Sequence, residues 1–263
     1  MEKKNRRAPR FLVPVVWVAG VIVVWELVSF LLDAVIKDPQ AAKKLPYLHD
    51  VVLAFFQNWQ SMLQAGGVTL SRAALGFLFG IAIGFVLAVL MSLSKIFEKI
   101  AMPYLLIMQM IPILGLAPII FSLVKDLDSS RIVIATYITF YPIALNTLSG
   151  FQAVGRDRRD LLYTYAASRV TVYRKLMLPA ALPALFTGMR IAAPMAVTAS
   201  ILVDMLSNKD GIGSIMIMSL YGGGNKFWPA VLTGILMGVL STAIVSLLQW
   251  ICIPWQRKAK ARG

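Results

Sequence analysis

The sequence is poor in the side chains that most often carry out chemistry. It contains one cysteine, Cys252, and one histidine, His49. A single cysteine excludes an intrachain disulfide, a cysteine metal cluster and a redox pair. No phosphate loop of the form Gly-x-x-x-x-Gly-Lys-Ser/Thr occurs, and no two carboxylates are placed on a shared face as an acid/base couple. We therefore expect no catalytic residue, no metal ligand and no cofactor in this chain.

Charge is also scarce, and most of it has one sign. Charged residues make up 14% of the chain, with 26 lysines and arginines against 12 aspartates and glutamates. Hydrophobic residues make up 59%, and the mean hydropathy is +0.75. The basic residues do not form a stripe interleaved with aromatics, as a nucleic-acid-binding face would. They gather at the ends of long apolar runs, which predicts a membrane protein that contacts the lipid bilayer and no nucleic acid.

A helix that crosses a bilayer needs about 20 mostly apolar residues. Runs of that length predict an all-α integral membrane protein with six transmembrane helices, at about residues 11–36, 68–93, 100–124, 132–151, 179–206 and 227–254. Residues 37–67 form a polar connector, with a short amphipathic piece at about 51–63 that is expected to lie at the membrane interface. The basic N-terminus is similar to the start of a signal peptide but lacks a cleavage site, so we expect a retained first helix.

The positions of the basic residues predict the orientation, because lysine and arginine are enriched in cytoplasmic loops. With both termini placed inside, the inner segments hold the larger share of them: Lys3, Lys4, Arg6, Arg7, Arg10, Lys95, Lys99, Arg156, Arg158, Arg159, Arg169, Arg174, Lys175, Arg257, Lys258, Lys260 and Arg262. The outer connectors hold few lysines, mixed with aspartates. We expect a multi-pass protein of the cell membrane with cytoplasmic N- and C-termini.

Two spans contain patterns that bear on packing and transport. In the second span, Gly76, Gly80, Gly84 and Ala88 recur at every fourth position, which is typical of close helix packing. The third span contains three prolines, and broken helices are tolerated in membranes mainly where they are buried in protein or line a cavity. This span is therefore either part of a solute pathway or a kinked packing helix.

Ionisable residues inside a bilayer cost about 3 kcal/mol each and should face protein or water. Glu26 is expected to have a structural partner, and Arg190 is equally consistent with a structural or a gating role. Asp33 and Asp204 are expected near the outer ends of their spans, where they could reach the headgroups. The pathway candidates are Gln109, Pro112, Pro118, Thr139, Asn146, Arg190, Thr198 and Asp204.

The inner loop from Arg156 to Pro179 is patterned. Its apolar residues recur at helical spacing against arginines and lysines, which predicts two short amphipathic helices. Ser168 lies between them and is expected to cap the second. The pattern alone is consistent with a membrane-surface element or with a docking site for a cytoplasmic partner.

This loop resembles that of the permease subunits of binding-protein-dependent ABC importers. In that family the loop carries Glu-Ala-Ala, then Gly, then Ile-x-Leu-Pro. Here the same spacing holds Asp160-Leu-Leu, Ala166 and Leu176-Met-Leu-Pro179. Over about residues 68–250, further runs resemble the nitrate, sulfonate and taurine branch: Thr69-Leu-Ser-Arg72, Ile111 to Pro118, Phe140-Tyr-Pro142, Asn146-Thr147, Ser168-Arg169, Arg174 to Pro183, Thr187 to Ala192 and Asp210-Gly-Ile-Gly213.

The resemblance implies a type I ABC importer permease with a five-helix core and one extra N-terminal helix. The expected parts are residues 1–67 (basic segment, first helix and outer connector), 68–254 (transport core, with the coupling loop at 156–178) and 255–263 (basic cytoplasmic tail). The implied partners are an ABC ATPase dimer that binds ATP and Mg, a second permease as a homodimer, and an extracytoplasmic substrate-binding protein. The implied coupling residues are Asp160, Leu161, Leu162, Tyr165, Ala166, Arg169, Leu176 and Pro179.

One departure from the family pattern has a structural consequence. Glycine at the turn permits a left-handed backbone, and alanine there costs about 1 kcal/mol if that conformation is required. For the solute, the resemblance suggests sulfonates, taurine, nitrate or vitamin precursors. The alternative function is a secondary transporter or channel driven by an ion gradient, whose usual inverted repeats and paired broken helices are not visible in this sequence.

Overall fold

The computed structural model describes residues 12–37, 40–207, 209–222 and 224–255. The basic N-terminal cluster and the basic C-terminal tail lie outside these residues. The described elements are all helical: α1 (Leu12–Phe30), η1 (Leu31–Val35), α2 (Ala41–Lys44), α3 (Leu48–Gln57), α4 (Trp59–Leu93), α5 (Lys95–Met110), α6 (Ile113–Val124), α7 (Leu127–Gln152), α8 (Arg156–Thr164), α9 (Arg169–Val172), η2 (Tyr173–Met177), α10 (Leu178–Ser207), α11 (Ile212–Gly222) and α12 (Phe227–Cys252).

Within the described residues, five helical stretches are long and apolar enough to cross a membrane, and there are six if the bent pair α5–α6 counts as one span. The predicted count of six is confirmed in that sense. The third span differs from a simple helix, because α5 and α6 meet at an angle of 97°. The break lies at Ile111 and Pro112, where proline cannot donate a backbone hydrogen bond to the preceding turn.

Several predicted boundaries were wrong because hydropathy alone decided them. The second span begins at Trp59, not at residue 68, and its polar first turns look like a connector although Met62 is fully buried. The amphipathic piece at 51–63 is divided between α3 and the start of α4. The Gly-rich connector between the fifth and sixth spans contains a helix, α11, that the sequence did not suggest.

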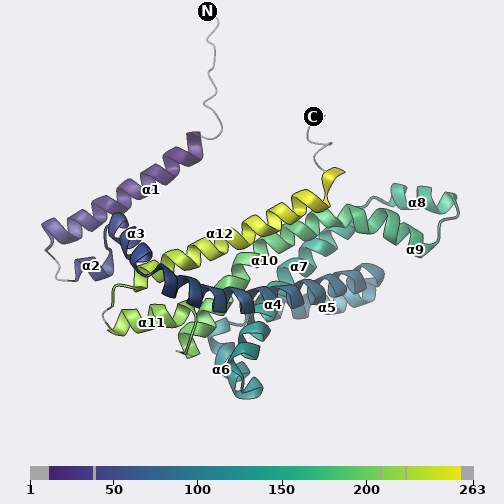
Figure 1. Ribbon diagram of the computed structural model, residues 1–263. Coiled ribbons are helices and arrows are strands. Elements are labelled where there is room, and N and C mark those ends of the chain that lie inside the picture. The colour runs from purple at the N-terminus through teal and green to yellow at the C-terminus, as the bar shows by residue number, and fades with distance from the viewer. Residues whose placement is uncertain (1–11, 38–39, 208, 223, 256–263) are drawn as a thin grey trace, which may run out of the picture.

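Helices α4, α7 and α10 form the centre of the molecule, with α12 packed along α10 (Figure 1). The predicted glycine stripe of α4 lies against α7. A Cβ at Gly84 would lie 2.6 Å from the carbonyl oxygen of Phe140, and one at Gly76 would lie 2.7 Å from that of Ile132. Larger side chains would therefore force these two helices apart.

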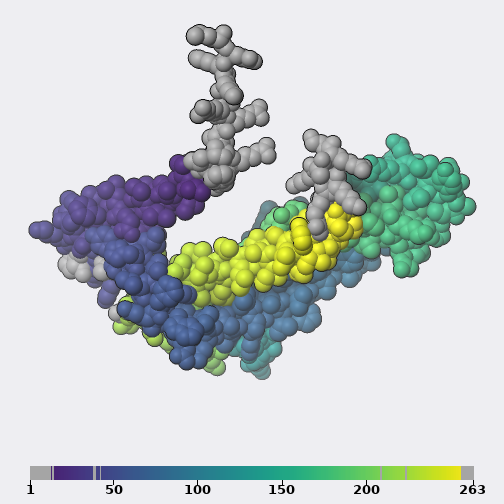
Figure 2. All heavy atoms as spheres, turned by 45° about the horizontal axis from the view of Figure 1, so that its top comes forward, coloured from purple at the N-terminus to yellow at the C-terminus, as the bar shows by residue number. Residues whose placement is uncertain are grey.

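The molecule is elongated, and its two ends are different (Figures 1 and 2). Helices α8 and α9 project at one end, and α11 lies at the other, beside α2 and α3. The last turn of α12 and the first turn of α1 point toward the α8–α9 end. Helix α1 stands away from the central helices. It contacts α3, where Glu26 Oε1 accepts a hydrogen bond from the backbone N–H of Leu48 at 3.0 Å, and α12, where the rings of Trp25 and Trp228 lie 5.1 Å apart. The expected structural partner of Glu26 is therefore present.

Candidate functional site

The α8–α9 projection presents apolar side chains to its surroundings. Leu161 is 57% exposed, Tyr165 78% and Val170 65%. They stand among charged residues, because α8 begins with Arg-Asp-Arg-Arg-Asp. Of the remaining predicted coupling residues, Asp160, Ala166 and Arg169 are also exposed. We call Leu161, Tyr165 and Val170 the docking patch.

Other predicted coupling residues face inward. Leu162 and Leu176 are half-buried and pack against a cluster that includes Phe151, Val172 and Met177. Pro179 is also half-buried, in the first turn of α10. The structure thus divides the predicted coupling set into exposed residues and residues that attach the projection to the central helices.

The turn between α8 and α9 has the geometry that favours glycine. The N–H of Ala166 donates to the carbonyl of Tyr163 at 2.9 Å, and the N–H of Ala167 donates to that of Leu162 at 3.1 Å. This pair of bonds defines a Schellman motif, which needs a left-handed residue after the helix. Ala166 occupies that position with φ = +56°. Ser168 caps α9 as predicted, its Oγ accepting from the N–H of Thr171 at 3.2 Å.

The projection continues into the membrane-spanning part without a break. Residues Arg169–Ser207 form one continuous helical stretch of 39 residues, with a π turn, η2, just before Pro179. Tyr173 is the first residue of η2. Its hydroxyl hydrogen-bonds to that of Ser92 near the end of α4, and its ring lies 5.3 Å from that of Phe151. Helix α9, η2 and α10 therefore form one continuous helical segment, which also contacts the end of α4.

The break between α5 and α6 borders a groove of about 330 Å³. Predicted pathway residues Gln109 and Pro112 line it, together with Tyr137 and Tyr141 of α7 and Met195 of α10. Because Pro112 has no N–H, it cannot donate to the carbonyl of Met108, and the hydroxyl of Tyr137 donates there instead. The two tyrosines were missed by sequence reasoning, although their i, i+4 spacing places them on one face of a spanning helix.

The remaining predicted pathway residues are not gathered at this groove. Pro118 and Thr198 are exposed on α6 and α10, and Arg190 is half-buried on α10. Asn146 is half-buried, and its Nδ2 donates to the carbonyl of Pro142 at 2.7 Å. None of these four residues lines the groove at the break.

Thr139 and Asp204 require correction, because both are completely buried. Thr139 lies in the α4–α7 contact, where its Oγ1 donates to the carbonyl of Ala135 at 2.7 Å and its Cβ faces Gly80. Asp204 does not reach toward headgroups. Its Oδ1 lies 2.7 Å from Nε of Arg131 in a close ion pair that lacks hydrogen-bond geometry, and its Oδ2 accepts from Thr69 Oγ1 at 2.6 Å.

Arg131 is the residue that the sequence analysis overlooked. Its side chain is fully buried, yet it lies five residues into α7, where charge suggested only an outer connector. Besides Asp204, it contacts Asp128 through Nη1 at 2.8 Å and both the carboxylate and the carbonyl of Asp210 through Nη2. Its run of neighbours, Asp126-Leu-Asp-Ser-Ser-Arg131, offered the signal: an arginine three residues after an aspartate at a helix start.

The helical spans, the broken span beside a groove and the apolar projection on a membrane-spanning helix define a polytopic transport subunit that works with a soluble partner. Residues 80–258 match the family described as "Binding-protein-dependent transport system inner membrane component". The chain belongs to this family. It is the multi-pass inner-membrane permease of an ABC importer, not the ATPase, and the family's systems include an ATPase and a binding protein.

Individual relatives agree with this assignment. The chain is 31% identical to the formylaminopyrimidine transport permease ThiX of Halalkalibacterium halodurans over 72% of this chain and 76% of the relative. It is 25% identical to the nitrate import permease NrtB of Synechocystis sp. over 95% and 92% of the two chains. It is 25% identical to the putative aliphatic sulfonates permease SsuC of Bacillus subtilis, over 90% and 85%.

The fold is also that of a solved transporter. A chain of the inward-facing MetNI methionine ABC transporter superposes with a TM-score of 0.62 at 19% identity, covering 72% of this chain and 95% of that one. At this identity the match supports the fold alone. The predicted family, the five-helix core with an added N-terminal helix, and the transport class are confirmed, and the ion-gradient alternative is set aside.

Proposed function

We propose that this permease imports a small solute and that its docking patch on α8 and α9 binds the ATPase subunit. The observation that carries the proposal is the exposure of Leu161, Tyr165 and Val170 on a segment rich in charge. Exposed apolar side chains that lie outside the spanning helices favour a protein partner over solvent.

The membrane-surface alternative fits the geometry less well. Helices α8 and α9 extend beyond the ends of α5 and α7, along the direction of the long helices (Figure 1). An element that lies flat on a bilayer would turn its apolar face back toward the spanning helices. The inward-facing Leu162 and Leu176 instead pack against the protein's own apolar cluster around Phe151.

The proposed orientation places the α8–α9 end, and both termini, in the cytoplasm. The support is the bias of arginine and lysine toward this end of the molecule. Helix α11 then lies on the extracytoplasmic side, where the binding protein docks. We further propose that two copies of the chain pair as a homodimer, as the family resemblance implies, with the groove at Gln109 and Pro112 turned toward the pathway.

The proposed solute is small and polar, of the sulfonate, taurine or nitrate type or a vitamin precursor. The relatives named above transport formylaminopyrimidine, nitrate and aliphatic sulfonates, according to their names. The groove offers the amide of Gln109 and the hydroxyl of Tyr141, which can contact any of these by hydrogen bonds.

The test is recovery of the partner from native membranes. Tagged wild-type chain, solubilised in detergent, should retain an ABC ATPase that mass spectrometry identifies, and Leu161→Arg plus Tyr165→Arg should lose it. Both replaced side chains are exposed, so the variant should still fold. The matched control is Tyr221→Arg, since Tyr221 is 83% exposed on α11 at the opposite end.

Loss of the ATPase in the control as well would indicate a general defect and contradict the placement of the docking patch. A wild-type chain that comes alone and moves solute in liposomes without ATP would overturn the proposal. A binding protein that co-purifies would identify the solute, through thermal shifts with nitrate, taurine and formylaminopyrimidine.

A further inference from the structure

The ion network around Arg131 joins four elements at the end of the molecule that carries α11. Arg131 belongs to α7, Asp204 to α10, Asp210 to the α10–α11 connector, and Thr69 to α4. The Oγ1 of Thr69 also accepts a hydrogen bond from the backbone N–H of Ile212, the first residue of α11, at 3.0 Å. The position of α11 relative to the spanning helices is therefore set by this network.

The network has a buried part and an exposed part. Arg131 and Asp204 are completely buried, whereas the side chain of Asp210 is 52% exposed and that of Asp128 is 45% exposed. If Asp210 were withdrawn, Arg131 would still be paired with Asp204 and Asp128. The buried charges would remain compensated, so the Arg131–Asp210 contact can break without leaving an isolated charge in the interior.

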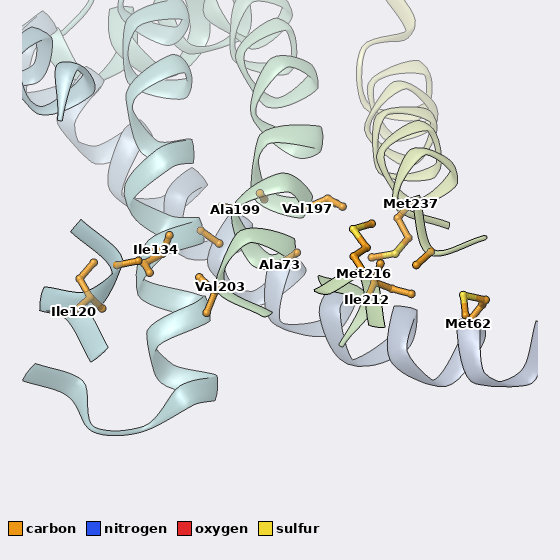
Figure 3. Close-up of a cluster of buried hydrophobic side chains, with 14 residues drawn as sticks. Met62, Ala73, Ile120, Ile134, Val197, Ala199, Val203, Ile212, Met216 and Met237 are labelled. Carbon is orange, nitrogen blue, oxygen red and sulfur yellow. The ribbon is translucent and has the colours of Figure 1, made fainter. Parts of the chain in front are cut away.

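The remaining contacts of α11 tolerate a shift. Ile212 and Met216 lie in an apolar cluster with Met62 of α4 and Met237 of α12 (Figure 3). Methionine side chains are unbranched and flexible, and they repack against a moving neighbour more readily than branched residues do. The apolar contacts of α11 to α4 and α12 can therefore be kept when α11 shifts. The contact between Asp210 and Arg131 is an ion pair with a defined geometry, so it must break.

The connector is also held closely against Asp204. Gly211 has φ = +90°, and a Cβ on it would collide with the Asp204 carboxylate. Ser214 Oγ donates toward the carbonyls of Asp204 and Asp210, each at 2.9 Å. The Asp-Gly-Ile-Gly run found in the sequence is therefore the segment that closes over this buried pair.

We propose that Arg131 and Asp210 form a releasable latch. In the closed state the latch holds the α10–α11 connector against α7, and its release lets α11 move when the pathway opens toward the extracytoplasmic side. The buried Arg131–Asp204 pair stays intact and serves as the anchor. Arg131 acts as a positioning residue, and the proposal rests on the transport function and orientation proposed above.

The test uses cysteine labelling, because Cys252 is the only native cysteine. In a Cys252→Ser background, Ile212→Cys places a thiol at a site that is 0% exposed when the connector is closed. The protein is placed in lipid nanodiscs, so that a water-soluble maleimide reaches both faces. Asp210→Asn should speed labelling about tenfold, since the contact with Arg131 loses its negative charge and keeps only neutral acceptors, the side-chain amide and the main-chain carbonyl.

The matched control is Asp126→Asn. It removes the same charge at the start of α7, the helix that carries Arg131, but Asp126 caps that helix through Ser129 and asparagine caps equally well. Labelling should stay at the wild-type rate. Ser200→Cys provides a second reporter, because Ser200 is also fully buried and its hydroxyl donates to the carbonyl of Thr69.

A functional arm links the latch to transport. In the complex with the co-purified ATPase, trapping with ATP and vanadate should speed labelling of Ile212→Cys in the protein that retains Asp210. Trapping should speed labelling less in Asp210→Asn, where the latch is already weakened. Equal labelling of Asp210→Asn and Asp126→Asn at both reporters, or no change on trapping, would refute the latch. Failure to recover an ATPase counts against the docking proposal instead, because the first labelling arm needs no partner.

Discussion

Replacing Ala166 with glycine is expected to stabilise the turn between α8 and α9. Ala166 adopts φ = +56° in a Schellman motif. A left-handed backbone costs a residue with a Cβ about 1–2 kcal/mol. Glycine removes that cost but loses about 0.5–1 kcal/mol more conformational entropy on ordering. The net gain is about 0.5–1 kcal/mol, which corresponds to a roughly two- to fivefold lower population of the open turn.

Hydrogen–deuterium exchange in nanodiscs measures this directly, because local opening governs exchange of the amides of Ala166 and Ala167. Their exchange should slow roughly two- to fivefold in Ala166→Gly, and affinity for the ATPase should rise by a similar factor if docking requires the ordered turn. The control is Ala167→Gly, since Ala167 is not at positive φ and glycine there should speed exchange. Equal acceleration in both variants would refute the argument from backbone conformation.

Three further outcomes follow from the packing. Arg131→Met should lower the free energy of unfolding by about 3–5 kcal/mol because Asp204 is left as an unpaired buried charge, and adding Asp204→Leu should recover much of the loss in a thermal unfolding series. Gly80→Ala should cost about 1–3 kcal/mol by overpacking α4 against α7, whereas Gly67→Ala, with nothing within 4 Å of the new Cβ, should unfold close to the wild-type temperature. Tyr137→Phe should cost about 0.5–1.5 kcal/mol by removing one of the two hydrogen bonds to the Met108 carbonyl, which keeps the bond from the N–H of Ile111, and an equal loss on replacing the other groove tyrosine would contradict that explanation.

The sequence predicted the features that depend on local pattern. The amphipathic spacing of the α8–α9 loop, the Ser168 cap and the glycine stripe of α4 each depend on residues a few positions apart, and the structure agrees with all three. The strain at Ala166 was anticipated from the family resemblance, because the family has glycine at this turn and glycine alone adopts a left-handed backbone at no steric cost.

The pairing of Arg131 with Asp204 could not be predicted in this way. The two residues lie on different helices, and only the packing of α7 against α10 brings them together. Taken singly, Asp204 looked like a residue near the membrane surface, and Arg131 looked like part of a connector. The 97° break had a local signal in Pro112, but the hydrogen bond that Tyr137 donates there from another helix had none.

The continuous stretch Arg169–Ser207 bears on how the two ends of the pathway move relative to each other. It connects the α8–α9 turn to the anchor at Asp204, and 35 residues of helix correspond to about 50 Å. A rod of this length that rocks about a pivot in the middle moves its two ends in opposite directions. If the stretch rocks in this way, the mouth of the pathway on one side of the membrane narrows as the mouth on the other side widens.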